Sequence, residues 1–462
     1  MYHSFKFTKA LRCLQPTVPS GYGMAVLLFS YIFFASSCVV QKVGLTPENH
    51  LLNDTVLRHA FTGIAVYDAT KNSWVHRHNS EKYFVPASNT KIPTLYAALK
   101  YLPAQLPGML YAERNDTLFL LPTGDPTLLH PDYPQHPVYT FIRNSSRVPV
   151  LLEGNWRSKP LGFGWAWDDY ESYYMAERSA LPVYGNYITW VQERRLEQRN
   201  GQTDTNLLVY SIPEVNFDVN FSAETASAFE VQRHRTENKY TILPGRERQR
   251  KIEVPFVANG IATAAALLKD TLWKELPVVP LANPSFSFQP LYSQPTDSML
   301  QQLMYRSDNF FAEQTLLMVS QQLFGYMDEQ RLIDSLLQTD FKDMPQKPKW
   351  VDGSGLSRYN LFTPENFIWL LLKMKDTFGM QRLQQLFPTG NRGTLRNYYV
   401  AENGLLFAKT GTLSSHVALS GYLYTRQNRL LVFSVLVNNH FTSATSVRRA
   451  VERYLQALRQ QY

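Results

Sequence analysis

Apolar and polar positions alternate near both ends of the chain in a pattern that predicts strands. Residues 63–68 and 73–77 are each typical of a short strand, and the polar segment 69–72 between them predicts a turn. Further strands are predicted at 405–409, 417–424 and 430–437, and the last of these is almost wholly apolar. We therefore expect strands from both ends of the chain to share one sheet, with helices packed on its face.

Two segments have the spacing of helices. In the segment 88–100, Pro93 falls in the first turns, and Leu95, Ala98, Leu99 and Leu102 share one face, which predicts an amphipathic helix that begins at Ser88. Apolar residues recur at 3.6-residue spacing from Val447 to Leu458, which predicts a helix that closes the chain.

The middle of the chain has a different character. From about residue 111 to 284 it is rich in Pro, Trp and Tyr and contains short β-like runs such as 206–212. This pattern predicts one or two small β-rich domains inserted into a larger one. We expect residues 39–105 and 285–462 to form the main, discontinuous domain and residues 106–284 to form the insertion. The expected fold class is α/β (α+β), with an antiparallel sheet flanked by helices.

Length and composition are those of a globular protein. The chain has 462 residues and is 44% hydrophobic, which is enough for a sizeable core and two or three domains. Its formal net charge is +8, but Lys and Arg are scattered and form no block or stripe, so we expect no nucleic-acid partner.

The N-terminus predicts export. Basic residues at 6, 9 and 12 precede an uncharged run at 24–35, which is followed by Ser36, Ser37 and Cys38. The small residues before Cys38 resemble a bacterial lipoprotein signal, in which this cysteine is lipidated and becomes the first mature residue. A plainly cleaved signal and a retained membrane anchor are the alternatives. Because Cys13 precedes the signal, the mature chain would contain no disulfide. The expected location is periplasmic, with or without a membrane anchor.

Three short motifs contain residues suited to nucleophilic catalysis. Ser88 and Lys91 form S-x-x-K, and one helical turn between them would let the amine reach the hydroxyl. The same pair could be an N-cap serine and a solvated lysine. Ser307 and Asn309 open the apolar segment 310–317, where such residues also serve as helix caps.

The third motif ends the predicted strand 405–409. Lys409 is followed by Thr410, Gly411 and Thr412, and the alternative here is a lysine at a sheet edge followed by a glycine turn. Taken in order, S-x-x-K, S-x-N and K-T-G match the signature of penicillin-recognising serine enzymes.

The flanking residues make this resemblance specific. The chain resembles the class C low-molecular-mass penicillin-binding proteins, the type-four D-Ala-D-Ala carboxypeptidase/endopeptidase family, over most of its length from Gly63. The similar segments are 124–128, 164–169, 307–313, 352–358 and 409–414. The resemblance implies a penicillin-binding-protein/β-lactamase-like transpeptidase domain with smaller insertions. It also implies a serine DD-peptidase that acts on peptidoglycan stem peptides, is acylated by penicillin and other β-lactams, and needs no cofactor.

The family's functional residues map onto matching positions of this chain. Ser88 would be the nucleophile, Lys91 the base, and Ser307 a proton relay between Lys91, Lys409 and the leaving amine. Asn309 would hold a substrate carbonyl, and Lys409, Thr410, Gly411 and Thr412 would border the terminal carboxylate. A pocket for the side chain of a diaminopimelate-type residue would be formed by Asp169, Tyr174, Arg358 and Ser414.

Two rival interpretations remain open from the sequence. A class C β-lactamase uses Y-x-N in place of S-x-N, and Tyr184, Gly185 and Asn186 supply that motif. A non-catalytic envelope scaffold could keep the same fold. The ten histidines show no ligand spacing, and G-x-S-x-G and H-E-x-x-H motifs are absent, so we expect no metal site. The sequence makes no prediction of oligomeric state.

Overall fold

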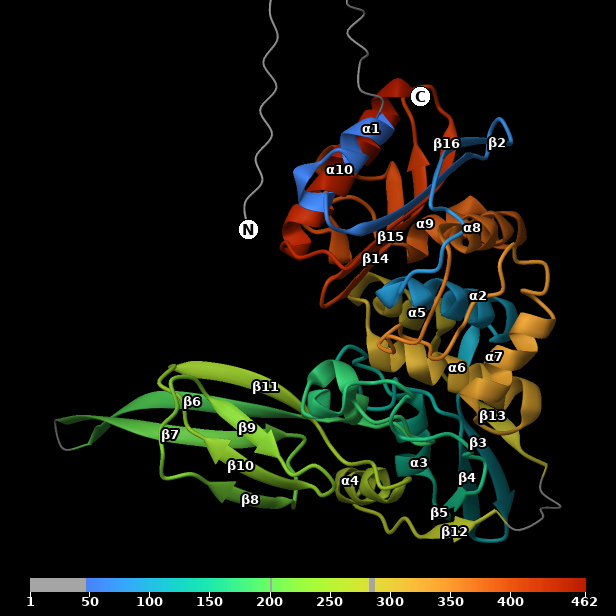
Figure 1. Cartoon of the computed structure of the whole chain (residues 1–462). Coiled ribbons are helices and arrows are strands. Elements are labelled where there is room, and N and C mark those ends of the chain that lie inside the picture. The colour runs from blue at the N-terminus through green and yellow to red at the C-terminus, as the bar shows by residue number, and fades with distance from the viewer. Residues whose placement is uncertain (1–46, 200–201, 282–286) are drawn as a thin grey trace, which may run out of the picture. The chain divides into compact units, whose positions relative to one another are not determined.

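The computed structural model describes residues 47–199, 202–281 and 287–462 (Figure 1). The predicted export segment 1–38, with Cys13 and Cys38, lies outside these described residues. Within them, no helix has both the length and the apolar character that crossing a membrane requires.

The main sheet joins strands from the two ends of the described chain, as predicted. Its five strands are all antiparallel and have the order β14-β15-β16-β1-β2. They are β1 (Phe61–Asp68), β2 (Ser73–His78), β14 (Leu406–Leu413), β15 (His416–Tyr424) and β16 (Leu430–Asn438). The strand β14 extends beyond the predicted 405–409, so Lys409, Thr410, Gly411 and Thr412 lie within a strand and do not end one.

Helices cover both faces of this sheet, which explains why β16 is apolar almost throughout. Phe433 and Val435 pack with α10 (Ala444–Gln461) on one face. Val432 and Leu436 pack with α2 (Lys91–Tyr101) and α8 (Pro364–Phe378) on the other. A strand that is buried on both faces has apolar side chains on each, so its sequence does not alternate between apolar and polar residues. The short helix α1 (Pro47–Leu52) lies against α10 (Figure 1).

The predicted amphipathic character of the helix after Ser88 is wrong. Ser88 belongs to a 3-10 turn, Ala87–Thr90, and α2 itself starts at Lys91. Every residue from Lys91 to Leu99 is buried, because α2 is enclosed by the main sheet and by neighbouring helices. A helix surrounded on all sides needs no polar face. The remaining helices of this layer are α5 (Thr296–Arg306), α6 (Asn309–Phe324), α7 (Glu329–Gln338) and α9 (Met380–Leu386).

The middle of the chain forms three further sheets around a separate apolar cluster. The largest has the order β12-β5-β4-β3-β13 and consists of β3 (Gln105–Arg114), β4 (Thr117–Pro122), β5 (Val148–Glu153), β12 (Val278–Pro280) and β13 (Gln289–Pro295). The helices α3 (Pro137–Asn144) and α4 (Ala262–Leu272) accompany it. The strand β13 lies beyond residue 284, where we expected the insertion to end, and pairs with β3.

The other two sheets have three strands each. One has the order β11-β6-β7 and consists of β6 (Tyr187–Arg199), β7 (Gln202–Ile212) and β11 (Gln249–Pro255). The other has the order β8-β10-β9 and consists of β8 (Asp218–Phe221), β9 (Glu230–Arg233) and β10 (Lys239–Leu243). The predicted strand 206–212 is the second half of β7.

Candidate active site

The turn that presents Ser88 is held tightly from several sides. Ser88 is partly exposed, whereas Ala87, Asn89 and Thr90 around it are buried. The side-chain amide of Asn89 contacts Ser420 Oγ of β15 at 2.7 Å, and Thr90 Oγ1 donates to the carbonyl of Ala87 at 2.9 Å. A turn fixed in this way holds one hydroxyl at the surface in a single position.

Two glycines let other segments approach this turn closely. A Cβ on Gly411 of β14 would lie 2.7 Å from the carbonyl oxygen of Pro86 and 3.0 Å from the amide nitrogen of Ser88. A Cβ on Gly355 would lie only 1.9 Å from the carbonyl oxygen of Ala87. Any larger residue at either position would push its strand or loop away from Ser88.

Lys91 lies one turn after Ser88 and is completely buried. Its Nζ lies 3.0 Å from Ser88 Oγ, 2.6 Å from Asn309 Oδ1 and 2.7 Å from the carbonyl oxygen of Ser354. Burial lowers the pKa of Lys91 to about 8, although the nearby carboxylates of Asp352, Asp308 and Glu313 oppose that shift. The alternative of a solvated lysine is therefore wrong.

Ser307, Asp308 and Asn309 form the joint between α5 and α6. Ser307 ends α5 in a left-handed conformation with φ of 59°, and Asp308 is the N-cap of α6, whose side chain accepts from the amide of Phe311. Asn309, the first residue of α6, donates from Nδ2 to the carbonyl of Tyr174 at 3.0 Å. The capping interpretation is thus correct for Asp308, which leaves Ser307 and Asn309 free to face the lysines.

A second serine–lysine pair lies beside the first. Lys409 Nζ donates to Ser307 Oγ at 2.8 Å and to the carbonyl of Thr410 at 2.7 Å. Lys409 is fully buried, and burial together with the positive charge of Lys91 holds its pKa well below the usual range. Burial is also the main cause of the lowered pKa of Lys91.

The structure adds residues that the sequence motifs did not name. Asp352 accepts hydrogen bonds from the amides of Gly355 and Ser357 at 2.8 and 2.7 Å, and this closes the loop that supplies the Ser354 carbonyl to Lys91. Glu313 Oε1 accepts from the amide of Ser354 at 2.7 Å. Both acids lie in segments that resemble the family, which was the only signal for them.

Glu313 forms a buried ion pair with Arg178. Arg178 Nη1 lies 3.1 Å from Glu313 Oε2 and 3.1 Å from Glu329 Oε1. Burial raises the pKa of Glu313, and the guanidinium of Arg178 opposes this shift. Nothing in the sequence near Arg178 distinguishes it from a surface arginine.

The four residues expected to form the side-chain pocket occur as two pairs. Tyr174 and Asp169 come from the loop 160–175, where the carboxylate of Asp169 contributes to a raised pKa of the Tyr174 hydroxyl, whose largest cause is burial. Arg358 Nη1 donates to the carbonyl of Ser414 at 3.4 Å. The loop 160–175 also contacts the segment 352–358, which contains Arg358. Trp165 Nε1 of the loop donates to Asp352 Oδ2 at 3.0 Å.

The Y-x-N alternative lies apart from the two lysines. Tyr184 Oη shares a hydrogen bond of 2.7 Å with Thr271 Oγ1 of α4, and Asn186 Nδ2 donates to the carbonyl of Glu177 at 2.8 Å. The hydroxyl that contacts Lys409 belongs to Ser307.

The described residues offer no group of three or more His, Cys, Asp and Glu side chains that could hold a metal ion. A hydroxyl on a rigid turn, a buried amine of lowered pKa beside it, and a second serine–lysine pair form an arrangement that can carry out acyl transfer.

Comparison with known proteins agrees with this chemistry. The model of the D-Ala-D-Ala carboxypeptidase 3 (S13) family matches residues 48–461, and the chain belongs to that family. Carboxypeptidase DacB of Mycolicibacterium smegmatis is 31% identical over 159 residues, which are 32% of this chain and 34% of that relative. The matched segment thus spans about a third of the relative's length.

Solved structures show the same fold. Penicillin binding protein 4 from Haemophilus influenzae superimposes with a TM-score of 0.67 at 20% identity, over 86% of this chain and 95% of that one. A second structure of the same protein, complexed with a β-lactam, gives a TM-score of 0.64 at 18% identity, over 87% and 96% of the two chains. The predicted fold class is confirmed.

Proposed function

We propose that this protein is a serine DD-peptidase that hydrolyses D-Ala-D-Ala termini or D-Ala-diaminopimelate cross-links of peptidoglycan through an acyl-enzyme on Ser88. The observation that carries the proposal is the contact of 3.0 Å between Lys91 Nζ and Ser88 Oγ, because Lys91 is buried and has a pKa lowered to about 8. A lysine in this state releases its proton near neutral pH and then accepts the proton of a hydroxyl.

The three contacts of Lys91 suit a neutral amine. A neutral amine has two N–H donors and one lone pair. Asn309 Oδ1 and the carbonyl of Ser354 accept the two donors, which leaves the lone pair to accept the hydroxyl proton of Ser88. Ser88 Oγ then attacks the carbonyl carbon of the penultimate D-Ala as its proton passes to Lys91.

Ser307 completes the proton transfer. Its hydroxyl contacts Lys409 Nζ at 2.8 Å and can pass a proton to the nitrogen of the leaving amine as the C–N bond breaks. The product of this step is an ester between Ser88 and D-Ala, together with a free amine. The proton that Lys91 took from Ser88 passes back through Ser307, which returns Lys91 to its neutral form. Lys91 then deprotonates a water molecule, which hydrolyses the ester and restores the Ser88 hydroxyl.

Backbone amides supply the oxyanion site in this proposal. We assign that role to the N–H groups of Ser88 and Thr412, which belong to the turn and the strand that Gly411 brings together. Lys409, Thr410 and Thr412 would bind the terminal carboxylate, and the second N–H of Asn309 would hold the substrate's amide carbonyl. A diaminopimelate side chain would lie between the Asp169–Tyr174 pair and the Arg358–Ser414 pair.

Mass spectrometry of the β-lactam adduct tests the proposal. The β-lactam complex of Haemophilus influenzae penicillin binding protein 4 supports the choice of probe. We expect one penicilloyl adduct per chain, absent in Ser88→Ala and retained in Ser227→Ala, which alters an exposed serine outside the site. Failure of the unaltered protein to acylate would favour the scaffold interpretation, and rapid release of the adduct would favour a β-lactamase.

Analysis of muropeptides then separates the two peptidase reactions. Loss of one terminal alanine from stem peptides indicates carboxypeptidase activity, whereas conversion of cross-linked dimers to monomers indicates endopeptidase activity. Neither change should occur with Ser88→Ala.

We also propose that the chain works outside the cytoplasm, in the periplasm, attached to a membrane through lipidated Cys38. The basic residues, uncharged run and small residues before Cys38 support export. Mass spectrometry of the mature N-terminus tests this proposal. A lipid-modified Cys38 is expected, and an unmodified mature N-terminus or an intact segment 1–38 would contradict it.

A further inference from the structure

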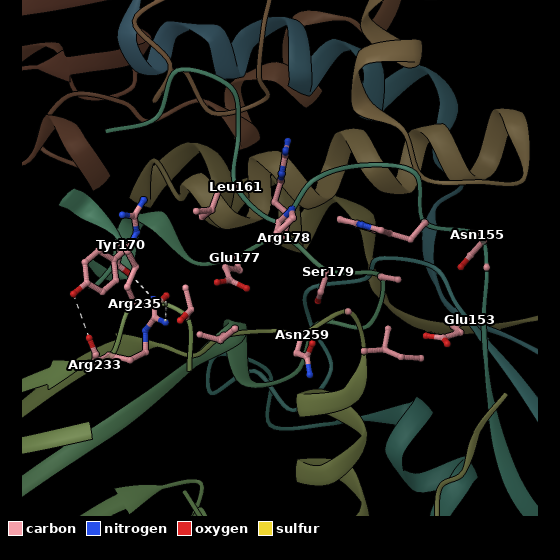
Figure 2. Close-up of a pocket in the computed structure, with 18 of the residues that line it drawn as sticks. Glu153, Asn155, Leu161, Tyr170, Glu177, Arg178, Ser179, Arg233, Arg235 and Asn259 are labelled. Carbon is pink, nitrogen blue, oxygen red and sulfur yellow. Dashed lines mark hydrogen bonds between the residues drawn. The ribbon is translucent and has the colours of Figure 1, made fainter. Parts of the chain in front are cut away.

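A second cavity lies apart from the residues assigned to catalysis. It has a volume of about 880 Å³, and its walls come from β5, β9, β12 and the segments 154–161, 177–180 and 257–261 (Figure 2). None of the residues in the proposed catalytic and substrate-binding set lines it. Its size and its position where several sheets meet are typical of a small-molecule site.

One end of this cavity is cationic. Arg233 at the end of β9 is 97% buried, since only 3% of its surface is exposed. Its guanidinium donates to the carbonyls of His234, Arg235 and Tyr170, and its Nε has no hydrogen-bond partner among the described residues.

Arg233 also has no ion-pair partner in the described part of the chain. Burial lowers its pKa, and the carboxylates of Glu177 and Glu171 oppose that shift from beyond ion-pair distance. A buried guanidinium without a contacting carboxylate is costly, and an anionic group that enters the cavity would offset that cost.

Arg235 adds a second, exposed guanidinium at the same end. It lies 5.1 Å from the centre of the Trp167 ring. Among the described residues it too makes no ion pair. In Figure 2 both arginines lie beside Tyr170, on one side of the cavity.

The other end is acidic. Glu153, the exposed last residue of β5, lies there with Asn155, on the side of the view opposite to the two arginines (Figure 2). Glu153 has no ion-pair partner within the described ranges. Glu177 lies between the two ends, where one of its oxygens accepts from the amide of Ala258 at 2.8 Å. Arg178, which pairs with Glu313 and Glu329, and Ser179 also lie between the two ends (Figure 2), and Trp156, Leu161 and Ile261 add apolar lining.

We propose that this cavity is a second, non-catalytic binding site for a short zwitterionic peptide. The peptide would place a carboxylate at Arg233 and Arg235 and a free ammonium at Glu153, with its apolar part against the wall between them. Charge-assisted hydrogen bonds at both ends would make recognition depend on the two free charges. The inference goes beyond hydrolysis at Ser88 and rests on the proposed function only in the choice of probe.

Calorimetric titration of the full chain with the tripeptide L-Ala-γ-D-Glu-meso-diaminopimelate tests this site. The tripeptide lacks D-Ala and cannot be hydrolysed as a DD-peptide. The protein would contain Ser88→Ala and Arg358→Ala to weaken binding at the catalytic site. We expect one remaining binding event per chain, and we expect the tripeptide with both amines acetylated and all three carboxyl groups amidated to lose it.

Paired variants locate the event. Adding Arg235→Ala and Glu153→Gln should weaken binding about tenfold or more, because hydrogen bonds to charged groups contribute more than neutral ones. The matched pair Arg248→Ala and Glu224→Gln, at exposed positions outside the cavity, should leave binding unchanged. Thermal melts of each variant establish that it is folded.

Absence of binding in the starting variant would overturn the proposal. An affinity that Arg235→Ala and Glu153→Gln leave unchanged would also overturn it, as would binding of the capped tripeptide. Penicillin acylation and peptide hydrolysis by the unaltered protein report separately on the proposed function, so each proposal can fail without the other.

Discussion

Lys91 Nζ lies 2.7 Å from the main-chain oxygen of Ser354. The lysine that we assign as the base is therefore oriented by a loop whose own shape depends on Asp352 and Glu313. Because the acceptor is a main-chain atom, the identity of the side chain at 354 does not determine the contact, but the path of the loop does.

We expect β-lactam acylation to accelerate with pH below about 8 and to level off above it. Only the proton-free amine of Lys91 can accept the Ser88 proton, and its pKa is about 8. Each pH unit below that value should therefore lower the second-order acylation rate constant about tenfold. Rates measured from pH 6 to 9.5 check this. A flat profile, or a rate that falls between pH 6 and 8, would contradict the role of Lys91.

Asp352→Asn should destabilise the protein and shift that pH profile. The Asp352 carboxylate accepts from four groups, the side chains of Trp165 and Asn360 and the amides of Gly355 and Ser357. An asparagine offers one acceptor oxygen, so we expect a loss of about 2–4 kcal/mol in the free energy of unfolding.

The profile should shift because the negative charge of Asp352 raises the pKa of Lys91. Its removal should therefore move the rising part of the profile to lower pH. Urea denaturation and acylation rates provide the two measurements. Asp343→Asn, at an exposed position, is the control and should change neither. Equal stability of the two variants would count against the account of the loop.

Gly411→Ala should slow acylation at least about a hundredfold. The added methyl would lie 2.7 Å from the carbonyl oxygen of Pro86 and 3.0 Å from the amide nitrogen of Ser88. The strand must then shift relative to the nucleophile, and a displacement of about 1 Å can cost roughly that factor in rate. Gly404→Ala provides the contrast.

At Gly404, φ is +74° and no atom lies within 4 Å of the added methyl. That substitution should lower the melting temperature through backbone strain and leave acylation near its original rate. Similar acylation rates for both variants would show that close approach of β14 is not required.

Asp169→Ala should remove a preference for peptides with free diaminopimelate and spare penicillin acylation. A carboxylate at this position would pair with the ammonium of that side chain, and a site with charged groups discriminates against a substrate that leaves them unpaired. Specificity constants for a diaminopimelate pentapeptide and for an acyl-D-Ala-D-Ala peptide measure the preference. Asp168→Ala, one residue earlier, is the matched control. Equal constants for the unaltered enzyme would defeat the prediction.

The residues nearest the reaction could be predicted because they recur at short, fixed spacings. One turn of helix brings Lys91 to Ser88, and one joint between helices holds Ser307 and Asn309. The strands at both ends of the chain could also be predicted, since Leu430 to Val437 is apolar except for Ser434.

The features that the sequence did not predict depend on contacts between residues that lie far apart in the chain. The α2 helix contains Lys91 and Thr94, which suggest a polar face, yet both are buried because partners from distant segments satisfy them. Arg178 reaches Glu313 only in the folded chain, so no spacing between them could predict the pair. Lys409 lies inside a strand because pairing with β15 continues through Gly411 to Leu413, although a glycine by itself disfavours a strand.

The pairing of β1 with β16 sets the order in which the chain can fold. Ile64 lies opposite Val435, so β1 gains its second neighbour, the central strand β16, only after synthesis has passed residue 438. Closing so long a loop is entropically slow, and the edge of β1 stays open until then. The helical layer can collapse around α2 beforehand, but the strand that positions Lys409 cannot be set beside Ser88 until β15 and β16 arrive. A nascent chain would therefore be inert until β16, which ends at Asn438, has been synthesised.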